Sequence, residues 1–328
     1  MMLDSLISCP KCSGNLDKNN VGYICNQCNQ KYDIEDGIVK LFYFPEFEKD
    51  TNVTEKIKSF YEKTPFPNYD DFDNIAQLME KSRKGVFVKL LDEQIPFNSS
   101  IIECGCGTGQ LSNFLSISNR TVLGTDMCLN SLRLANEFKI KNELNTVNFI
   151  QMNLFYPAVK EKSFDVVISN GVLHHTSDPF LGFKTISTLV KPGGHILIGL
   201  YHKYGRIYTN IRQFIFNMTK DSFKFLDKRL IADEANESRK NAWFQDQYKN
   251  PHESKHTIAE VMQWFNACGF QFIKSIPKDG IYESFSEDER LFESDESVGS
   301  FERYIKELSM IFTNSKDSGF FIMIGKKI

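Results

Sequence analysis

The sequence predicts an α/β protein with an open, Rossmann-like parallel sheet and helices on both of its faces. Two observations lead to this fold class. The stretch 101–110, IIECGCGTGQ, joins an apolar strand to a glycine-rich turn, and apolar residues at helical spacing follow the turn. Further apolar strands then recur over 121–126, 147–151, 164–170 and 189–199, the last of them beginning with a turn.

The glycine-rich turn predicts a site for a polar ligand. Glycine is required where a backbone turns with positive φ or lies close against a ligand. A strand that leads through such a turn into a helix also places free backbone N–H groups and the positive end of the helix over one point. The spacing is G-x-G-x-G, which differs from the G-x-G-x-x-G of dinucleotide-binding folds, and no Gly-Lys-Ser/Thr of a phosphate-binding loop accompanies it.

An acid at the end of the second strand extends this prediction. Asp126 lies 19 residues beyond Gly107. An acid about 20 residues after the glycine turn is where a second parallel strand presents a carboxylate to a ribose diol. We therefore expect Asp126 to accept hydrogen bonds from both ribose hydroxyls of a bound nucleoside.

The five segments and their order resemble the class I S-adenosylmethionine-dependent methyltransferases (type 11/12-like), especially the branch with segments such as 164–175, FDVVISNGVLHH, and 189–198, LVKPGGHILI. The resemblance covers residues 96–202 and implies a seven-stranded sheet that binds S-adenosylmethionine. The cofactor-binding residues that it implies are Glu103, Gly105, Cys106, Gly107, Gly109, Asp126, Met127, Asn153, Leu154 and Asn170. Asn153 stands where the family usually has aspartate, and its side-chain oxygen can still accept a hydrogen bond from the adenine amino group.

Composition restricts the classes of partner. The chain has 328 residues, 41% of them hydrophobic and 25% charged, as in ordinary soluble proteins. A net charge of −3 argues against a broad nucleic-acid surface, so we expect nucleic acid to be an unlikely partner. The N-terminus lacks a secretion signal and no apolar run reaches the length of a membrane span, so we expect a cytoplasmic protein with free thiols.

Residues 1–44 predict a small zinc-ribbon domain. Two CxxC pairs, Cys9 with Cys12 and Cys25 with Cys28, can supply four thiolates to structural zinc, and a segment this short needs such a cross-link to fold. The segment resembles the zinc ribbons that precede or partner some methyltransferases. Its four lysines and five acids do not indicate RNA binding. We favour a folding and docking module over a substrate-recognition module, and the sequence leaves both open.

Residues 45–95 predict an N-terminal helical cap that is interrupted at Pro65 and Pro67, because proline ends a helix before it. Aromatic residues gather around the break: Phe60, Tyr61, Phe66 and Tyr69. Two interpretations remain. The aromatic rings pack the cap onto the sheet, or one tyrosine, Tyr61 or Tyr69, borders the cofactor pocket.

Residues 96–328 predict the methyltransferase domain with insertions at 203–256 and 278–317. A capping box at Thr257 and Glu260 starts its last helix, and strands over 271–276 and 320–325 complete the sheet. Apolar residues at helical spacing indicate that the first insertion forms a helical lid over the pocket. The second insertion begins with an acidic run, which is typical of a solvated or mobile face.

The string 252–256, HESKH, has the H-E-x-x-H spacing of zinc proteases. That chemistry requires both histidines on one face of a continuous helix. Here Pro251 precedes the string and the capping box begins a helix only after it, so the string is predicted to lie in a loop.

Methyl transfer from a sulfonium requires the protein to position the acceptor and to exclude water. A base is needed only where the acceptor carries a proton that must leave. The catalytic candidates are His174, His175, Tyr248, His252 and His256. The first two follow the fourth strand at the edge where open parallel sheets bind ligands, and the other three belong to the polar end of the predicted lid.

The predicted function is transfer of a methyl group from S-adenosylmethionine to a small-molecule acceptor, through an oxygen, nitrogen or sulfur nucleophile held under the lid. One alternative is an RNA base methyltransferase guided by the zinc ribbon. The other is a non-catalytic binding or scaffold protein on the same fold.

Overall fold

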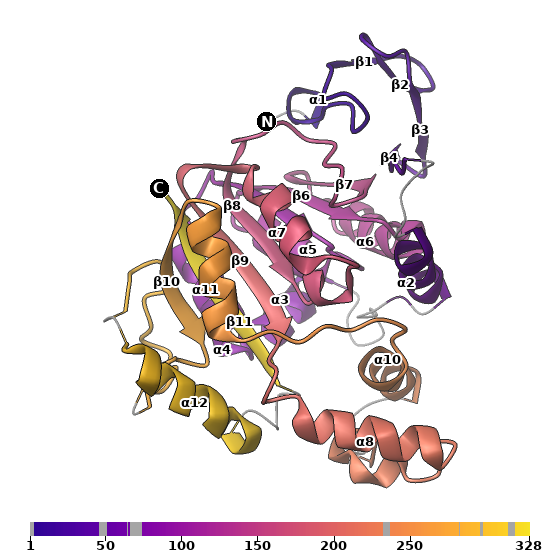
Figure 1. The fold of residues 1–328 in the computed structure, drawn as a ribbon. Helices are drawn as coiled ribbons and strands as arrows, with labels where there is room; N and C mark the ends of the chain where they lie inside the picture. The colour runs from indigo at the N-terminus through magenta and orange to yellow at the C-terminus, as the bar shows by residue number, and fades with distance from the viewer. Residues whose placement is uncertain are drawn as a thin grey trace.

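The computed structural model describes residues 3–45, 51–63, 65, 74–231, 237–281, 283–295, 298–313 and 319–328. Within these ranges, eleven strands form one sheet in the order β1-β2-β3-β4-β7-β6-β5-β8-β9-β11-β10 (Figure 1). The seven strands that follow the N-terminal segment are β5 (Ser100–Cys104), β6 (Thr121–Asp126), β7 (Val147–Met152), β8 (Phe164–Asn170), β9 (Val190–Tyr201), β10 (Phe270–Ile276) and β11 (Phe320–Lys327).

These seven strands confirm the predicted α/β fold. The strands β7, β6, β5, β8 and β9 are parallel neighbours, and β11 pairs antiparallel with both β9 and β10. The turn that we expected before the fifth strand lies within β9, which bulges between Val190 and His195 where it pairs with β8. The carboxyl ends of the parallel strands therefore meet at one edge, as the glycine turn and Asp126 require.

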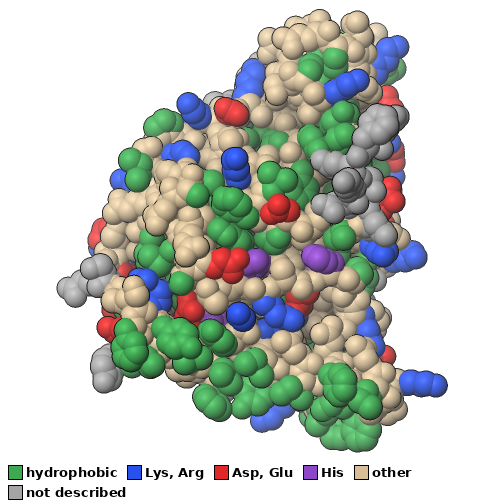
Figure 2. Space-filling view, in the orientation of Figure 1, with side chains coloured by type: hydrophobic (Ala, Val, Ile, Leu, Met, Phe, Trp, Pro, Cys, Tyr) green, Lys and Arg blue, Asp and Glu red, His purple; other side chains and the backbone are tan. Residues whose placement is uncertain are grey.

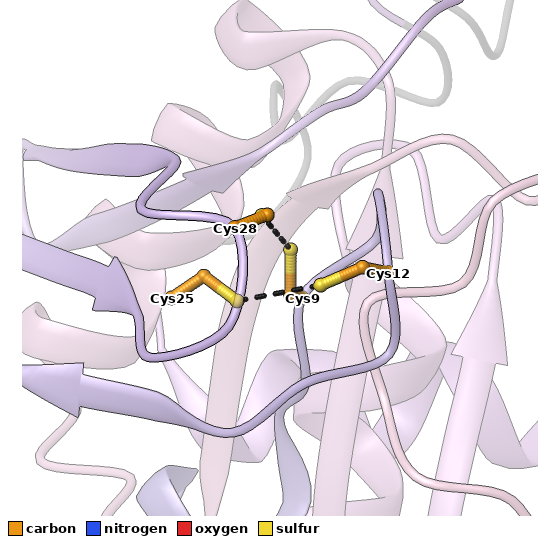
Figure 3. A group of neighbouring side chains, drawn as sticks. All are labelled: Cys9, Cys12, Cys25 and Cys28. Carbon is orange, nitrogen blue, oxygen red and sulfur yellow. Dashed lines mark hydrogen bonds between the residues drawn. The ribbon is translucent and has the colours of Figure 1, made fainter.

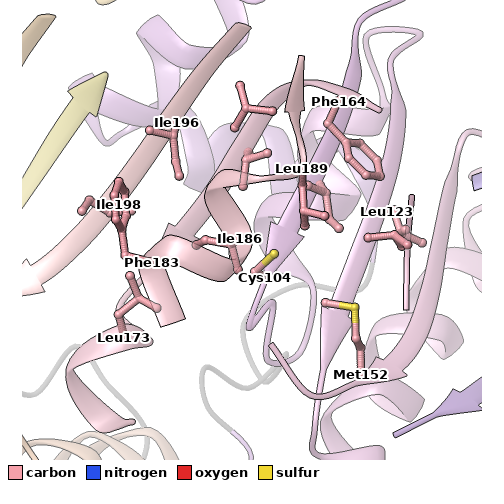
Figure 4. Packing of buried hydrophobic residues seen from close by; sticks show 14 of the residues in the cluster. Cys104, Leu123, Met152, Phe164, Leu173, Phe183, Ile186, Leu189, Ile196 and Ile198 are labelled. Atoms are coloured by element: carbon pink, nitrogen blue, oxygen red, sulfur yellow. The ribbon is translucent and has the colours of Figure 1, made fainter. Parts of the chain in front are cut away.

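Alternating strand residues divide between two apolar cores because successive side chains of a strand point to opposite faces. Ile102 and Val167 lie in the core under α7 (Pro179–Ser187) and α11 (Ile258–Ala267), part of which Figure 4 shows. Their neighbours Ile101 and Val166 lie in the opposite core. That core is covered by α3 (Ile75–Arg83), α4 (Val86–Gln94), α5 (Gln110–Ser116) and α6 (Leu129–Lys141).

The N-terminal segment enlarges the sheet beyond the seven strands that we predicted. It contains α1 (Leu3–Leu6), β1 (Leu16–Lys18), β2 (Gly22–Cys25), β3 (Lys31–Glu35) and β4 (Ile38–Leu41). β1 to β4 form an antiparallel meander. β4 then pairs parallel with β7, with Val39 opposite Ile150 and Leu41 opposite Met152. The ribbon is thus joined to the main sheet through backbone hydrogen bonds.

Side chains reinforce this junction. Arg133 of α6 forms ion pairs with Glu35 and with Asp36, the latter at 2.8 Å between Nε and Oδ2. At the other end of the ribbon, the N–H of Ser8 donates to the carbonyl of Ala158 at 2.9 Å. The ribbon therefore contacts the large domain at two separate places.

The remaining helices lie at the carboxyl edge of the sheet and around it (Figure 1). They are α2 (Thr51–Lys63), the 3-10 turn η1 (Leu173–His175), α8 (Ile207–Met218), the 3-10 turn η2 (Lys224–Leu226), α9 (Lys228–Ile231), α10 (Glu237–Tyr248) and α12 (Ser300–Thr313). α11 starts as predicted, because the Thr257 side chain accepts from the N–H of Glu260. Residues 252–256 precede that helix in a loop, so the zinc-protease interpretation of H-E-x-x-H does not apply.

The acidic run after residue 278 is more ordered than we expected from its composition. Two of its acids, Glu289 and Asp295, hold the buried ammonium group of Lys274 at 2.6 and 2.9 Å. The ammonium group of Lys278 contacts the same two acids at 2.8 Å each. This cluster of two lysines and two acids connects residues 289–295 to β10. Within the described residues, no helix combines the length and hydrophobicity that crossing a bilayer requires.

Candidate functional site

A cavity of about 1000 Å³ opens at the carboxyl edge of the parallel strands. Its walls come from the β5–α5 turn, the ends of β6, β7, β8 and β9, and helices α2, α3, α4, α9 and α10. Strands β10 and β11 complete it. Residues far apart in the sequence thus share one chamber at the edge where open α/β sheets bind ligands.

The glycine turn forms the floor of this cavity. Gly105 has φ of +81°, and a Cβ atom there would lie 2.4 Å from the side chain of Val172. Gly109 has φ of +69°, and a Cβ atom there would lie 2.7 Å from both Ala135 and Phe149. Gly105 therefore shapes the turn at the cavity, whereas Gly109 lets α5 pack closely and does not line the cavity.

Asp126 closes the glycine turn from the neighbouring strand. Its Oδ2 accepts from the N–H of Gly107 at 2.9 Å, and its Oδ1 accepts from the N–H of Cys128 at 2.8 Å. Burial raises the pKa of Asp126 above its ordinary value, and the two backbone N–H groups oppose that shift. The carboxylate lines the cavity, so it stabilises the turn as well as facing any ligand there.

Glu103 is the second acid that lines the cavity. Its carboxylate accepts from the hydroxyl of Ser112, and burial raises its pKa to about 7, with Asp126 adding to the shift. Among the described residues, neither Glu103 nor Asp126 makes an ion pair. Two buried carboxylates without a cation beside a cavity fit a positively charged ligand, and S-adenosylmethionine carries both a sulfonium and an ammonium group.

The structure brings most of the predicted cofactor residues together. Those in the cavity wall are Glu103, Gly105, Cys106, Gly107, Asp126, Met127, Asn153, Leu154 and Asn170. The Asn153 oxygen accepts from the N–H of Phe155 at 3.1 Å, and its Nδ2 donates to the carbonyl of Tyr43 at 3.2 Å. An amide oxygen has two lone pairs, so one is left for an adenine amino group.

His175 is the histidine that the structure places in the cavity wall. Its Nδ1 lies 2.8 Å from the carbonyl oxygen of His252. A carbonyl only accepts, so Nδ1 carries the proton and Nε2 is the basic nitrogen of the neutral ring. Burial lowers the pKa of His175, which keeps the ring neutral at pH 7.

A hydrogen-bonded group of polar side chains lies beside His175 in the same wall. The hydroxyl of Tyr61 donates to Asp246 Oδ1 at 2.8 Å. The Nε2 of Gln247 donates to Asp246 Oδ2 at 2.8 Å and to the hydroxyl of Tyr201 at 2.7 Å. These four side chains and His175 all line the cavity, and they come from α2, η1, β9 and α10.

Arg206 contacts two members of this group, Tyr201 and Gln247. Its guanidinium lies 3.6 Å from the centre of the Tyr201 ring, donates to Gln247 Oε1 at 2.6 Å and pairs with Glu253 at 2.6 Å. The guanidinium is almost fully buried, so these contacts fix the orientation of Gln247 and Tyr201.

The other four catalytic candidates lie outside the cavity wall. His174 is buried against Tyr201, with ring centres 4.0 Å apart, and neither ring nitrogen has a hydrogen-bond partner among the described residues. The Tyr248 hydroxyl donates to Asp227 at 2.7 Å, and the ring of His256 contacts Ser254 and Glu260. His252 contributes its backbone carbonyl to His175.

Several wall residues did not figure in the sequence interpretation. Tyr201 and Arg229 add polar groups, and an apolar wall consists of Leu78, Val88, Ile276, Pro277, Phe285, Phe320 and Ile322. Tyr61 borders the cavity, whereas Phe66 and Tyr69 lie outside the described residues. Trp243, Asp246 and Gln247, which belong to the polar end of the predicted lid, also line the cavity and follow the i, i+3, i+4 spacing of one helix face.

The four N-terminal cysteines form a separate cluster (Figure 3). Their Sγ atoms all lie within 4.8 Å of one another, with Cys9 and Cys28 at 3.6 Å and Cys12 and Cys25 at 3.4 Å. Sulfur atoms around a tetrahedral zinc ion are about 3.8 Å apart at a Zn–S distance of about 2.3 Å. The Tyr32 hydroxyl lies 3.0 Å from Cys9 Sγ, where it can donate to a thiolate. The cluster therefore fits a closed tetrahedral metal site.

The sequence around the glycine turn matches a known protein family. Residues 102–198 match the family model described as a methyltransferase domain. This segment is a class I S-adenosylmethionine-dependent methyltransferase domain. It includes β6 to β8 and most of β5 and β9, and therefore carries the glycine turn, Asp126 and His175.

Curated relatives share this methyltransferase domain. The chain is 30% identical over 140 residues to the ubiquinone biosynthesis O-methyltransferase of Ralstonia nicotianae, an alignment that covers 40% of this chain and 58% of the relative. It is 24% identical over 233 residues to an uncharacterized protein of Synechococcus, covering 62% and 55% of the two chains. The chain thus spans about half the length of the curated relatives it matches.

Solved structures also resemble the chain. A chain from the complex of the Haloferax volcanii Trm112 methyltransferase activator with a methyltransferase aligns at 12% identity and a TM-score of 0.45, covering 77% of this chain and 92% of that one. A S-adenosylmethionine-dependent methyltransferase from Methanosarcina mazei aligns at 16% identity and a TM-score of 0.45, covering 73% and 97%.

Proposed function

We propose that the protein transfers a methyl group from S-adenosylmethionine to a hydroxyl group of a small amphipathic acceptor, with His175 as the general base. The observation that carries this proposal is the hydrogen bond from His175 Nδ1 to the His252 carbonyl. This hydrogen bond leaves Nε2 of His175 free to accept a proton, and His175 lines the same cavity as the glycine turn.

The cofactor side of the proposal rests on Glu103, Asp126 and the turn between them. When bound, S-adenosylmethionine supplies a methyl group activated by a sulfonium charge. The Gly105–Gly107 backbone holds the methionine portion, Asp126 accepts from the ribose hydroxyls, and Asn153 accepts from the adenine amino group. The charge of Glu103 complements the positive ligand.

The acceptor side rests on the cluster around Asp246. His175 takes the proton of the acceptor hydroxyl at Nε2, and the nearby carboxylates of Asp246 and Glu253 stabilise the imidazolium that forms. Tyr61 and Tyr201 present phenolic groups that orient the acceptor. The apolar wall between Leu78 and Ile322 holds the apolar part of the molecule.

The hydroxyl is favoured over other nucleophiles for two reasons. A thiolate or thioether needs no base, whereas a hydroxyl does. Several relatives are named as O-methyltransferases of ubiquinone biosynthesis. We propose by analogy that this chain also methylates oxygen, on an acceptor with an apolar body.

The first insertion serves as the lid in this proposal. α10 supplies Trp243, Asp246 and Gln247 to the wall, and α9 supplies Arg229. A segment that contributes part of the wall excludes water from the reacting atoms when the cavity is filled.

We further propose that Cys9, Cys12, Cys25 and Cys28 hold one structural zinc ion and that the ribbon stabilises the sheet edge. Among the described residues, none from 3–45 lines the cavity, and β4 is committed to pairing with β7. This arrangement supports the docking role over substrate recognition, and it disfavours an RNA acceptor guided by the ribbon.

The test compares His175→Gln with a matched control, His252→Ala. Both are assayed for S-adenosylhomocysteine formation with S-adenosylmethionine and a panel of catechols and phenols that carry alkyl tails. We expect His175→Gln to lower kcat by about 10²–10⁴-fold, the usual contribution of a general base, without weakening cofactor binding. His252→Ala keeps the backbone carbonyl and should keep kcat within a few-fold.

Two outcomes would contradict the assignment. Equal rates of His175→Gln and the native protein on an accepted phenol would remove the base role. Turnover of thiols with no turnover of any hydroxyl compound would replace the oxygen nucleophile with sulfur.

A further inference from the structure

The α8–α9 part of the first insertion exposes an unusual number of large apolar side chains. The insertion buries Phe216 against Phe244 and Tyr248, and this small core holds α8 and α10 together. The opposite side of α8 points outward, with Ile211, Phe214 and Met218 exposed to 50%, 64% and 70%. The segment that follows exposes Phe223, Phe225, Leu226 and Ile231 as well.

A second exposed apolar surface lies on α12. Phe301, Tyr304 and Phe312 are exposed to 79%, 50% and 73%. The space-filling view shows hydrophobic side chains gathered along its lower edge, over the positions that α12 and α8 occupy in Figure 1 (Figure 2). We call this surface, formed by the exposed apolar residues of 207–231 and α12, the apolar edge. Exposed apolar clusters of this kind mark interaction surfaces.

Within residues 203–231, the exposed charged side chains are positive. Lys220, Lys224 and Lys228 are exposed between and beside the apolar residues of the insertion. Of the two acids within 203–231, Asp221 is partly exposed and pairs with Lys249 at 2.7 Å, and Asp227 is buried. Aromatic and aliphatic side chains flanked by lysines are the composition of a surface that lies in the interface of an anionic membrane.

The acids of α12 are engaged internally as well. Glu302 accepts from the N–H of Ile281 at 3.1 Å, and Glu307 is buried and accepts from the N–H of Ala259 at 3.1 Å. Both carboxylates are therefore directed at neighbouring backbone of the protein. In the described part of α12, the outward side is formed mainly by aromatic and aliphatic groups.

We propose that the apolar edge docks the protein on the surface of an anionic lipid bilayer. The exposed phenylalanine, methionine and isoleucine side chains enter the boundary between headgroups and acyl chains, and the lysines face the anionic headgroups. A second copy of the chain is a poorer occupant. A two-fold interface through the same surface would bring the like-charged lysines of the two copies together.

The apolar edge lies next to the cavity, so docking would place the candidate site close to the lipid surface. α9 bears Ile231 on the apolar edge and Arg229 in the wall of the cavity. Arg229 also lies over the Trp243 ring at 4.5 Å, and that ring lines the cavity too. The membrane-facing segment is therefore the same segment that borders the candidate site.

The experiment measures binding of the full chain to vesicles by co-sedimentation. Vesicles of pure phosphatidylcholine are compared with vesicles that contain 30% phosphatidylglycerol, at low and high salt. We expect at least tenfold stronger binding to the anionic vesicles, weakened by salt. Phe214→Ser/Met218→Ser should reduce that binding at least tenfold, and Lys220→Glu/Lys228→Glu should remove the preference for anionic lipid.

Ile140→Ser is the matched control, because Ile140 is 66% exposed on α6 and lies outside the apolar edge. It should bind vesicles as the native chain does. Thermal melting and S-adenosylhomocysteine binding verify that each variant is folded. Failure of the native chain to bind anionic vesicles, or equal binding by the Phe214/Met218 variant, overturns the proposal. A dimer that light scattering detects and that the same variant dissociates also overturns it, in favour of a second copy.

Discussion

Cofactor binding should depend on pH because Glu103 is buried beside the cavity without a cation. Burial raises its pKa to about 7, so much of the ligand-free protein carries a neutral Glu103 at or below that pH. A ligand with sulfonium and ammonium charges favours the ionised carboxylate. Binding of S-adenosylmethionine should therefore release a proton from Glu103 and strengthen as the pH rises.

The magnitude follows from the pKa. With a pKa of about 7, the ionised fraction of Glu103 rises from roughly 0.1 at pH 6 to roughly 0.9 at pH 8. The affinity for S-adenosylmethionine should rise about tenfold over this interval, or about 1.4 kcal/mol. Calorimetric titrations at pH 6 in buffers with different ionisation enthalpies should detect close to one proton released per ligand bound.

Stability of the ligand-free protein should change in the opposite direction. The folded-state pKa of Glu103 lies above its ordinary value of 4.5, so burial favours the protonated form. Its contribution to the free energy of unfolding is complete below pH 4.5 and is lost as the pH rises through about 7. At pH 8, Glu103→Gln should therefore raise the free energy of unfolding, by at most about 3 kcal/mol.

Glu103→Gln is also the control for the binding experiment. Glutamine keeps the shape of the side chain and does not titrate, so the slope of affinity between pH 6 and pH 8 should flatten. A native protein whose affinity is constant over this interval would refute the reasoning. A Glu103→Gln variant that retains the full slope would assign the proton to another group, such as Asp126.

Three further predictions concern separate parts of the molecule. Asp126→Ala should weaken S-adenosylmethionine binding tenfold or more in calorimetry, because it removes a charged acceptor worth about 1.5–3 kcal/mol and also frees the turn at Gly107; unchanged affinity in a folded variant would remove the assignment. Metal analysis of protein purified without chelators should find one zinc per chain, and absence of zinc would contradict the site. Cys25→Ser should lower the melting temperature, and the protein that remains folded should still bind cofactor. Lys274→Met should lower the free energy of unfolding in urea by about 1–3 kcal/mol, because Lys278 alone then balances the partly buried carboxylates of Glu289 and Asp295; an unchanged midpoint would show that Lys274 adds no stability.

The main sheet was predictable because its signals are local. Alternating apolar residues, the glycine turn and the acid at 126 each depend on a few neighbouring positions. The pairing of β4 with β7 joins segments more than 100 residues apart, and the prediction of a separate ribbon missed it. A signal was present, since Ile38 and Val39 are both apolar and lie in opposite cores, as in an interior strand.

The proposed cofactor residues were predictable for the same reason, whereas on the proposed acceptor side the sequence named candidates, among them His175 and Tyr61, without showing how they meet. Glu103, Gly105 and Gly107 belong to one turn whose spacing fixes their relative positions. Tyr61 and His175, in contrast, come from segments more than 100 residues apart. Glu62 ties the end of α2 to the start of α6 by accepting from the N–H groups of Leu129 and Asn130 at 2.9 and 3.2 Å, and Tyr61 donates to Asp246 of α10. No local pattern announces a contact of that kind.

Helix α10 shows how helix geometry decides which residues reach the cavity. Successive helix residues point about 100° apart, so a dense polar stretch cannot all face one side. Phe244 and Tyr248 are four residues apart and pack on Phe216, which turns the Tyr248 hydroxyl toward Asp227 and away from the cavity. Trp243 shares the other face with Asp246 and Gln247, and that face lines the cavity. Once Phe244 is assigned to the core with Phe216, the helix period predicts that Asp246 lines the cavity and that Tyr248 packs beside Phe244.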